Sequence, residues 1–211
     1  MIVTDVSPFK GSMMCVELSG GGLAQEMKIY THSEIIRKYN VAKGMELSEE
    51  EADRLIYEND LRRARERALY LMESRDHSYR ELFDKLEKNY SEDICFEVCN
   101  RLAEIGVIND RRYAEKLCRQ LFEVKKLGRY RVRQEMRLKG LGSEIIEEAM
   151  ENFSEEDEPF ERLEKLVEQK YERYLTDRKG VEKVRNALAR KGYSFGEIKE
   201  VLDLYDLDFD D

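Results

Sequence analysis

The spacing of apolar residues changes near residue 60 of the chain. Before that point, short runs rich in Val, Ile and Met are separated by Gly and Ser, a pattern typical of strands. It predicts strands at residues 2–6, 13–18 and 23–29, with a turn at Ser19-Gly20-Gly21-Gly22 between the last two. The chain is therefore expected to begin with a small antiparallel sheet.

Two sequences that match helix capping boxes follow the predicted sheet. Thr31-His32-Ser33-Glu34 would open a short helix that ends near Asn40, and Ser48-Glu49-Glu50-Glu51 would open a second helix. The second helix is expected to break near Asn59 and to continue over residues 62–73.

From about residue 62 onward the apolar positions have helical spacing, and they repeat along the chain. Leu82, Val132 and Val184 occupy matching positions, which sets offsets of 50 and 52 residues between three copies. A whole register of matches indicates an internal repeat rather than chance. The other matching sets are Leu86, Met136 and Leu188; Tyr90, Gly140 and Gly192; Phe96, Ile146 and Ile198; and Cys99, Ala149 and Val201.

Each copy contains three predicted helices, bounded by capping residues and by glycines. Ser78 and Ser194 begin capping boxes, Asp110 is expected to be an N-cap, and Pro159 fits the first turn of a helix. Gly128 is expected to break the chain before the next helix.

One three-helix unit of this size can bury little apolar surface alone, whereas stacked units bury a continuous core. The predicted fold is therefore mainly α: tandem three-helix repeats stacked in an elongated curved array, with a small N-terminal sheet-plus-helix extension. The predicted domains are the extension at residues 1–60 and three repeats at residues 61–108, 109–157 and 158–211, the last with an acidic tail.

Composition supports a helical protein that acts by binding. Charged residues make up 39% and hydrophobic residues 41%, and there are only two prolines, which suits helices with solvated faces. No apolar run is long enough to span a membrane, and the N-terminus lacks the basic and apolar regions of a signal peptide. We therefore expect a cytoplasmic protein with no membrane partner.

Candidate catalytic and metal-binding residues are few. Neither His32 nor His77 has a Cys or a carboxylate at a convincing catalytic spacing. Cys95 and Cys99 are four residues apart, which is compatible with metal ligands, but no second ligand pair lies nearby in the sequence. We expect no catalytic residues, no metal site and no cofactor. Buried, reduced thiols are the preferred interpretation of all four cysteines, which are Cys15, Cys95, Cys99 and Cys118.

The net charge of −9 is spread unevenly, and two segments are strongly basic. Residues 125–139 hold seven bases against the single acid Glu135, and residues 178–191 hold six bases against Glu182. An acidic total argues against a protein that coats nucleic acid non-specifically, but it leaves room for a local basic contact surface.

Several of these bases occupy matching positions in the second and third repeats, where the first repeat has Glu81, Phe83 or Asn89. One interpretation is a solvated helix face that balances neighbouring acids. The other is a surface that contacts phosphates or an acidic protein, for which Arg is well suited because it binds in a bidentate manner. The candidate partner-binding or DNA-binding residues are Lys125, Lys126, Arg129, Arg131, Arg133, Arg137, Lys139, Arg178, Lys179, Lys183, Arg185, Arg190 and Lys191.

The last nine residues, 203–211, alternate acids with apolar residues. A frayed chain end is the simpler interpretation. The alternatives are a segment that mimics nucleic acid or one that docks on a basic patch.

Residues 65–205, about two thirds of the chain, resemble a known family. The motifs that carry the resemblance are Ala68-Leu69 with Leu71 and Arg75; Glu81-Leu82 with Lys85-Leu86; Asn109-Asp110-Arg111-Arg112-Tyr113-Ala114; Gly128 before Arg133; Lys139-Gly140; and Lys191-Gly192-Tyr193. In this order and spacing they are similar to the RecX family, the bacterial regulators of the RecA recombinase.

The resemblance implies tandem three-helix repeats that bind along the groove of a RecA filament on single-stranded DNA. It also implies that binding modulates, and mostly inhibits, ATP hydrolysis and strand exchange, within DNA repair, recombination and the SOS response. We expect a monomer that has the RecA filament as its partner and that also contacts single- or double-stranded DNA.

Two other classes of protein remain as alternatives. One is a helical DNA-binding protein that acts directly on DNA, because three-helix units resemble helix-turn-helix domains. The other is a hydrolase or another enzyme, against which the scarcity of nucleophile–base pairs counts.

Overall fold

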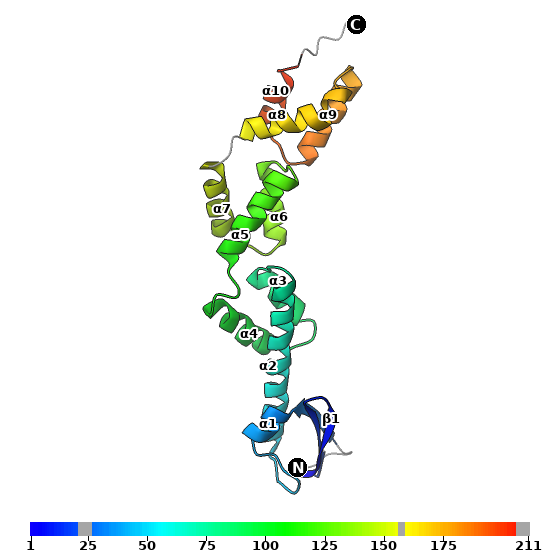
Figure 1. Ribbon diagram of the computed structural model, residues 1–211, viewed down its shortest axis with the longest axis vertical. Helices are drawn as coiled ribbons and strands as arrows, with labels where there is room; N and C mark the ends of the chain where they lie inside the picture. Colours follow the sequence, from blue (N-terminus) through cyan, green and yellow to red (C-terminus); the bar gives the residue numbers. More distant parts are fainter. Residues whose placement is uncertain (21–26, 156–158, 206–211) are drawn as a thin grey trace. The chain divides into compact units, whose positions relative to one another are not determined.

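The computed structural model describes residues 1–20, 27–155 and 159–205, which are mainly helical (Figure 1). The chain divides into two compact units. Unit 1 consists of Met1–Arg75 and Phe83–Glu104, and unit 2 consists of Asp76–Leu82 and the residues from Ile105 onward. Within the described residues, no helix combines the length and the apolar character that a membrane span requires.

Unit 1 begins with a three-stranded antiparallel sheet in the order β1-β2-β3, formed by β1 (Ile2–Lys10), β2 (Met13–Ser19) and β3 (Met27–His32). The small antiparallel sheet is thus confirmed. The third strand extends past its predicted end at residue 29, because β3 pairs with β2 as far as His32, which lies opposite Met13. Residues 21–26, which contain part of the predicted turn and strand, lie outside the described residues.

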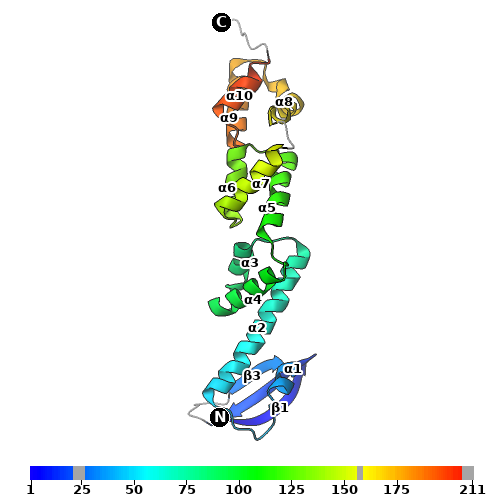
Figure 2. The ribbon, with the colours of Figure 1, turned by 90° about the vertical axis from the view of Figure 1, so that its left-hand side faces the viewer.

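The sheet packs on α1 (Ser33–Lys38) and on the first part of α2 (Glu49–Ser74), as Figure 2 shows. Val16 and Leu18 of β2 are fully buried in this core, because alternate residues of a strand face the same side. Ala52 and Leu55 of α2 contribute to the same core.

The two helix starts in unit 1 differ in how well the sequence predicted them. Ser48 and Glu51 form the predicted capping box, with hydrogen bonds of 2.8 and 3.1 Å. At α1, however, His32 and not Thr31 is the N-cap, since its Nδ1 accepts from the N–H of Glu34. Thr31 is fully buried at the end of β3 and so remains part of the strand.

The predicted break near Asn59 was wrong, because α2 is continuous over 26 residues. Asn59 is only 5% exposed, so it lies on a packed side of the helix. Apolar burial at Leu55 before it and at Ala64 after it outweighs the poor helix propensity of Asn, which costs at most about 0.7 kcal/mol.

The first repeat continues with α3 (Tyr79–Leu86) and α4 (Glu92–Glu104). The division between the two units falls within α3, after Leu82. The ring of Phe83 lies 4.8 Å from that of Phe96.

The second repeat lies in unit 2 and consists of α5 (Asp110–Arg119), α6 (Arg129–Leu138) and α7 (Ser143–Glu155). The predicted N-cap at Asp110 was one residue late, because Asn109 accepts from the N–H of Arg112 at 2.9 Å. The carboxylate of Asp110 instead accepts from the backbone N–H of Tyr79 at 2.8 Å.

The third repeat consists of α8 (Pro159–Lys170), a 3-10 turn (Glu172–Tyr174), α9 (Arg178–Arg190) and α10 (Phe195–Leu202). The helix start at Pro159 and the capping box of Ser194 with Glu197 are both confirmed. Repeats two and three each enclose an apolar cluster, around Met136 and Leu188 respectively.

The mainly α fold of three-helix repeats with a small N-terminal sheet is confirmed. The elongated curved stacking and the domain boundaries at residues 60, 108 and 157 stay predictions. Of the acidic tail, Leu204 is exposed and Tyr205 packs partly against the third repeat, whereas residues 206–211 lie outside the described residues.

Candidate partner-binding interface

Two junctions in unit 2 are built alike. At each one, the start of the second helix of a repeat meets the Lys-Gly pair that ends the second helix of the next repeat. The first junction is formed by Ser78, Glu81, Lys139 and Gly140. The second junction is formed by the corresponding residues Gly128, Arg131, Lys191 and Gly192.

The first junction balances its charge internally. The hydroxyl of Ser78 donates to the carbonyl of Lys139 and accepts from the N–H of Glu81. The ammonium of Lys139 lies 3.1 Å from the carboxylate of Glu81, which is largely buried. A Cβ at Gly140 would overlap the side chain of Arg80, so the close approach of these two residues requires glycine at position 140.

The second junction brings two backbones into contact. The N–H of Gly128 donates to the carbonyl of Lys191 at 2.9 Å. A Cβ at Gly128 would overlap the carbonyl of Gly192, and a Cβ at Gly192 would overlap the backbone nitrogen of Arg131. Gly192 also has a φ of +88°, a conformation that favours glycine. Both glycines are therefore required for this approach.

The charge of the second junction is not balanced in the same way, since Arg131 stands where the first junction has Glu81. The ammonium of Lys191 instead donates to the carbonyls of Lys125 and Lys126, at 2.9 and 3.4 Å. Within the described residues, no carboxylate lies within ion-pair distance of Lys191. Burial lowers the pKa of Lys191, and the positive charge of Lys170 lowers it further.

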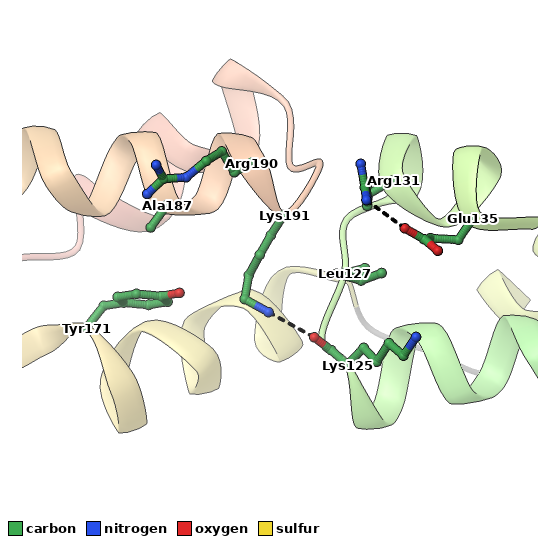
Figure 3. A pocket seen from close by; sticks show the side chains of 8 residues that line it. All are labelled: Lys125, Leu127, Arg131, Glu135, Tyr171, Ala187, Arg190 and Lys191. Carbon is green, nitrogen blue, oxygen red and sulfur yellow. Dashed lines mark hydrogen bonds and ion pairs between the residues drawn. The ribbon is translucent and has the colours of Figure 1, made fainter. Parts of the chain in front are cut away.

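A pocket of about 620 Å³ lies beside the second junction (Figure 3). Its side chains come from the segment before α6, from α6 itself, from the residue directly after α8, and from α9 and the residue directly after it. Four of them are basic and one is acidic. The lining residues are Lys125, Leu127, Arg131, Glu135, Tyr171, Ala187, Arg190 and Lys191.

The segment that carries Lys125 follows a single turn of π-helix, Gln120–Val124. The N–H of Lys125 donates to the carbonyl of Gln120 at 3.2 Å, and Lys126 has a φ of 51°, in the left-handed region. Such turns interrupt the regular helix and are often found at functional sites. Here the turn precedes the two carbonyls that bind Lys191.

The structure divides the predicted basic residues of α6 between two sides of the helix. Arg131 faces the pocket, where it pairs with Glu135 at 2.7 Å. Arg129, Arg133 and Arg137 are four residues apart and share another side. On that side Arg133 forms two hydrogen bonds with Glu147, at 2.7 and 2.8 Å, and they lower the pKa of Glu147.

These contacts show which predicted bases have carboxylate partners. Arg133 pairs with Glu147 and Lys139 pairs with Glu81, so both have structural roles. In the part of the chain that the structure describes, neither Arg129 nor Arg137 forms an ion pair. Of the three arginines that are four residues apart on α6, only Arg133 forms an ion pair among the described residues.

Only one predicted basic residue of α9, Arg190, lines the pocket, together with Lys191 directly after the helix. Lys183 does not line the pocket, although it lies four residues before the lining residue Ala187 and so on the same side of α9. The remaining predicted bases of α9 are exposed and do not line it. They are Arg178, Lys179 and Arg185.

Sequence reasoning missed Tyr171 as a site residue. The residue packs partly against the core of the third repeat. The structure leaves it half-buried and places it in the pocket wall (Figure 3). The sequence does contain a signal that could have identified Tyr171. It is an aromatic residue that follows the apolar positions of a helix and precedes a basic cluster.

The cysteines and histidines that were considered as catalytic or metal-binding residues belong to the core or to helix caps in the structure. All four cysteines are free and buried, as predicted, and burial raises the pKa of Cys99 to about 12. His32 caps α1, and His77 is buried. Among the described residues, no three or more potential ligands are grouped to hold a metal ion.

Three family models match consecutive parts of the chain. They describe the first three-helix domain of RecX, which matches residues 64–102, the second, which matches residues 109–150, and the third, which matches residues 156–202. Together they cover more than half of the 211 residues.

Individual proteins give the same result. Regulatory protein RecX of Clostridioides difficile (strain 630) is 29% identical over 180 residues, which cover 84% of this chain and 84% of the relative. Regulatory protein RecX of Bacillus subtilis (strain 168) is 27% identical over 183 residues, covering 85% of this chain and 69% of the relative.

Two solved structures are similar in fold. The crystal structure of regulatory protein RecX aligns with a TM-score of 0.67 at 21% identity, covering 96% of this chain and 98% of that chain. The crystal structure of RecX from Lactobacillus salivarius aligns with a TM-score of 0.61 at 26% identity, covering 71% of this chain and 98% of that chain.

Proposed function

The chain belongs to the RecX family, and on that premise we propose that it binds the RecA filament on single-stranded DNA and lowers its ATPase and strand exchange. The name shared by its relatives, regulatory protein RecX, supports a regulatory role over an enzymatic one. The same premise favours a cytoplasmic monomer that acts in DNA repair and recombination.

The observation that carries the proposal is the unbalanced positive charge around the second junction. Four basic side chains and one carboxylate line its pocket, and Arg129 and Arg137 add exposed or half-buried bases on α6. A filament on DNA presents phosphates and protein acids together, and a basic surface attracts both. The net charge of −9 opposes non-specific coating of free DNA, so the local surface favours a composite partner.

The test is the single-stranded-DNA-dependent ATPase of the cognate RecA, titrated with this protein at physiological salt. We expect ATPase to fall at protein concentrations too low to coat the DNA. ATPase that stays constant until the DNA is saturated would contradict the proposal.

A charge reversal locates the contact. The double variant Arg129→Glu with Arg137→Glu should weaken filament binding, because it reverses two bases that form no ion pair within the described residues and leaves both residues of the Arg133–Glu147 pair in place. A matched control is Lys43→Glu with Lys199→Glu, which reverses two exposed lysines that do not line the pocket. Circular dichroism checks that both variants keep their helices. Equal filament binding by the two variants would remove this side of α6 from the interface.

The second candidate function is a helical protein that binds DNA directly. The same basic pocket favours it, because phosphates alone would satisfy those side chains. Binding to naked DNA at physiological salt, measured beside the ATPase, separates the two. Tight naked-DNA binding together with an ATPase effect only at saturation would favour direct binding.

A further inference from the structure

The first repeat carries an exposed aromatic ring on its third helix. Phe96 of α4 is 44% exposed. Its ring centroid lies 4.8 Å from that of Phe83 of α3, which is buried, and both residues belong to unit 1. Because Phe83 supports one side of the ring, the exposed side of Phe96 can contact a partner with little further loss of conformational entropy.

The other repeats have charged residues in this place. Phe83, Arg133 and Arg185 occupy matching positions of the three second helices. Arg133 forms an ion pair with Glu147 of the third helix of its repeat, and Arg185 is exposed. The first repeat thus has two aromatic rings where the second has an ion pair and the third has a base.

The surface around Phe96 is acidic. Residues 84–97 contain five acids and two bases. Glu92 and Asp93 are exposed and lie one helical turn before Phe96 on α4. Within the described residues, neither of these two carboxylates forms an ion pair. A single exposed apolar residue is common in proteins, but a supported ring beside two unpaired carboxylates has a definite chemical preference.

Two neighbouring groups respond to this negative charge. Burial raises the pKa of the Cys95 thiol, and the charges of Glu87 and Glu92 raise it further. The hydroxyl of Tyr57 donates to the carboxylate of Glu97 at 2.8 Å, and this hydrogen bond, together with burial and the charge of the carboxylate, raises the pKa of Tyr57 to about 12. The carboxylates of α4 therefore create a negative potential that extends to the residues around them.

We propose that Phe96, Glu92 and Asp93 form a docking surface for a cationic segment of a protein, whose Lys or Arg side chain stacks on the ring and pairs with the carboxylates. The face of an aromatic ring attracts such a cation, and Arg also binds carboxylates in a bidentate manner. Nucleic acid does not fit, because unpaired carboxylates repel phosphates. The inference rests on the proposed function, in which RecA subunits of the filament supply the segment, and it adds a protein contact on the first repeat.

The test compares the binding of the full chain to two partners. One is a RecA filament assembled on oligothymidylate with a slowly hydrolysed ATP analogue, the other is the naked oligothymidylate, and biolayer interferometry measures both affinities. Phe96→Ala should weaken filament binding about tenfold and leave DNA binding unchanged. Phe96→Tyr, which keeps the ring, should retain the wild-type affinity. Unchanged filament binding by Phe96→Ala, or equal losses on both partners, would overturn the proposal.

Phe9→Ala is the matched control. Phe9 is 61% exposed, and its ring lies 4.6 Å from that of Tyr30 at an angle of 52°, close to the 54° between Phe83 and Phe96. Phe9→Ala should keep the wild-type affinity for the filament, and urea denaturation checks that both alanine variants remain folded. An equal loss of affinity in Phe9→Ala would show that exposed rings in general, and not this acidic surface, control binding.

The role of the carboxylates is tested by Glu92→Gln with Asp93→Asn. Filament affinity should fall about fivefold at low salt and less at high salt, because salt screens exposed charges. Glu49→Gln with Glu50→Gln is the control and should keep the wild-type affinity, since these exposed acids also lie in the first turn of a helix. A gain in filament affinity on neutralising Glu92 and Asp93 would show that phosphates approach this surface and would refute the inference.

Photocrosslinking identifies the occupant directly. The full chain with Phe96→p-benzoylphenylalanine is irradiated on the filament, and mass spectrometry locates the crosslinks. We expect crosslinks to RecA segments in which Lys or Arg adjoins the crosslinked residue. Crosslinks only to DNA or to a second copy of the chain would overturn the inference while leaving the proposed function intact. A wild type that does not bind the filament would instead contradict the proposed function itself.

Discussion

The first and second junctions are formed by corresponding elements of neighbouring repeats, but they differ in whether the lysine has a carboxylate partner. At the first, Lys139 finds Glu81 at 3.1 Å, so the lysine stabilises the fold and offers little to a partner. At the second, Arg131 occupies the position of the acid, and the ammonium of Lys191 donates hydrogen bonds to two backbone carbonyls. Carbonyl oxygens satisfy the hydrogen bonds of an ammonium but do not cancel its charge.

This difference shows how a repeat can specialise without changing its architecture. Both junctions have a glycine at the end of the second helix: Gly140 lies against the side chain of Arg80, and Gly192 lies against the backbone of Arg131. The residue at one position of the preceding repeat, Glu81 or Arg131, decides whether the lysine of the junction has a carboxylate partner.

The largest effect is expected from Gly128→Ala. The new methyl group would overlap the backbone of Gly192, and no flexible side chain can move aside, so we expect a loss of about 3 kcal/mol in the free energy of unfolding. Urea denaturation measures it. Gly142→Ala is the control, because its Cβ would meet nothing within 4 Å. Equal midpoints for the two variants would show that the second junction does not constrain the fold.

An intermediate effect is expected from exchanging the charges. Arg131→Glu would give Lys191 a carboxylate, as Glu81 does for Lys139, and affinity for single-stranded DNA should fall about tenfold. Glu81→Arg would place like charges at the first junction and should lower the free energy of unfolding by about 1 kcal/mol.

For both variants, fluorescence anisotropy with labelled single-stranded DNA measures the affinity, and urea denaturation measures the free energy of unfolding. A fall in DNA affinity for Glu81→Arg as large as that for Arg131→Glu would mean that total charge, and not the second junction, controls binding.

The smallest effect concerns pH. Because burial lowers the pKa of Lys191 in the folded state, the unfolded state binds more protons between that lowered pKa and the ordinary value of 10.5. The free energy of unfolding of the wild type, relative to Lys191→Met, should therefore rise as pH increases through this window. Urea denaturation at several alkaline pH values measures the difference. A difference that falls with pH would mean that the ammonium is stabilised in the junction.

The sequence predicted helices most reliably where local signals act alone. The capping boxes at Ser48 and Ser194 and the helix start at Pro159 depend on residues within one turn, and the structure has them where predicted. The errors arose where packing competes with local preference. Asn59 stays helical because both flanks of α2 are buried, and Thr31 stays in β3 because it is buried there.

The candidate site was predicted in composition but not in arrangement. Sequence reasoning named Lys125, Arg131, Arg190 and Lys191, and all four line the pocket. It grouped them with bases such as Arg133, which faces another side of α6 and is held by Glu147. No spacing rule could show that pairing, because Glu147 lies on a different helix.

The sequence by itself determined the helical period, the caps, the register of the three repeats and the residues that carry positive charge, because each depends on local order along the chain. Only the tertiary structure decided which charges remain unbalanced and that Tyr171 lies among them. Charge balance and pocket lining depend on distances between residues far apart in sequence, and packing of one helix against another sets those distances.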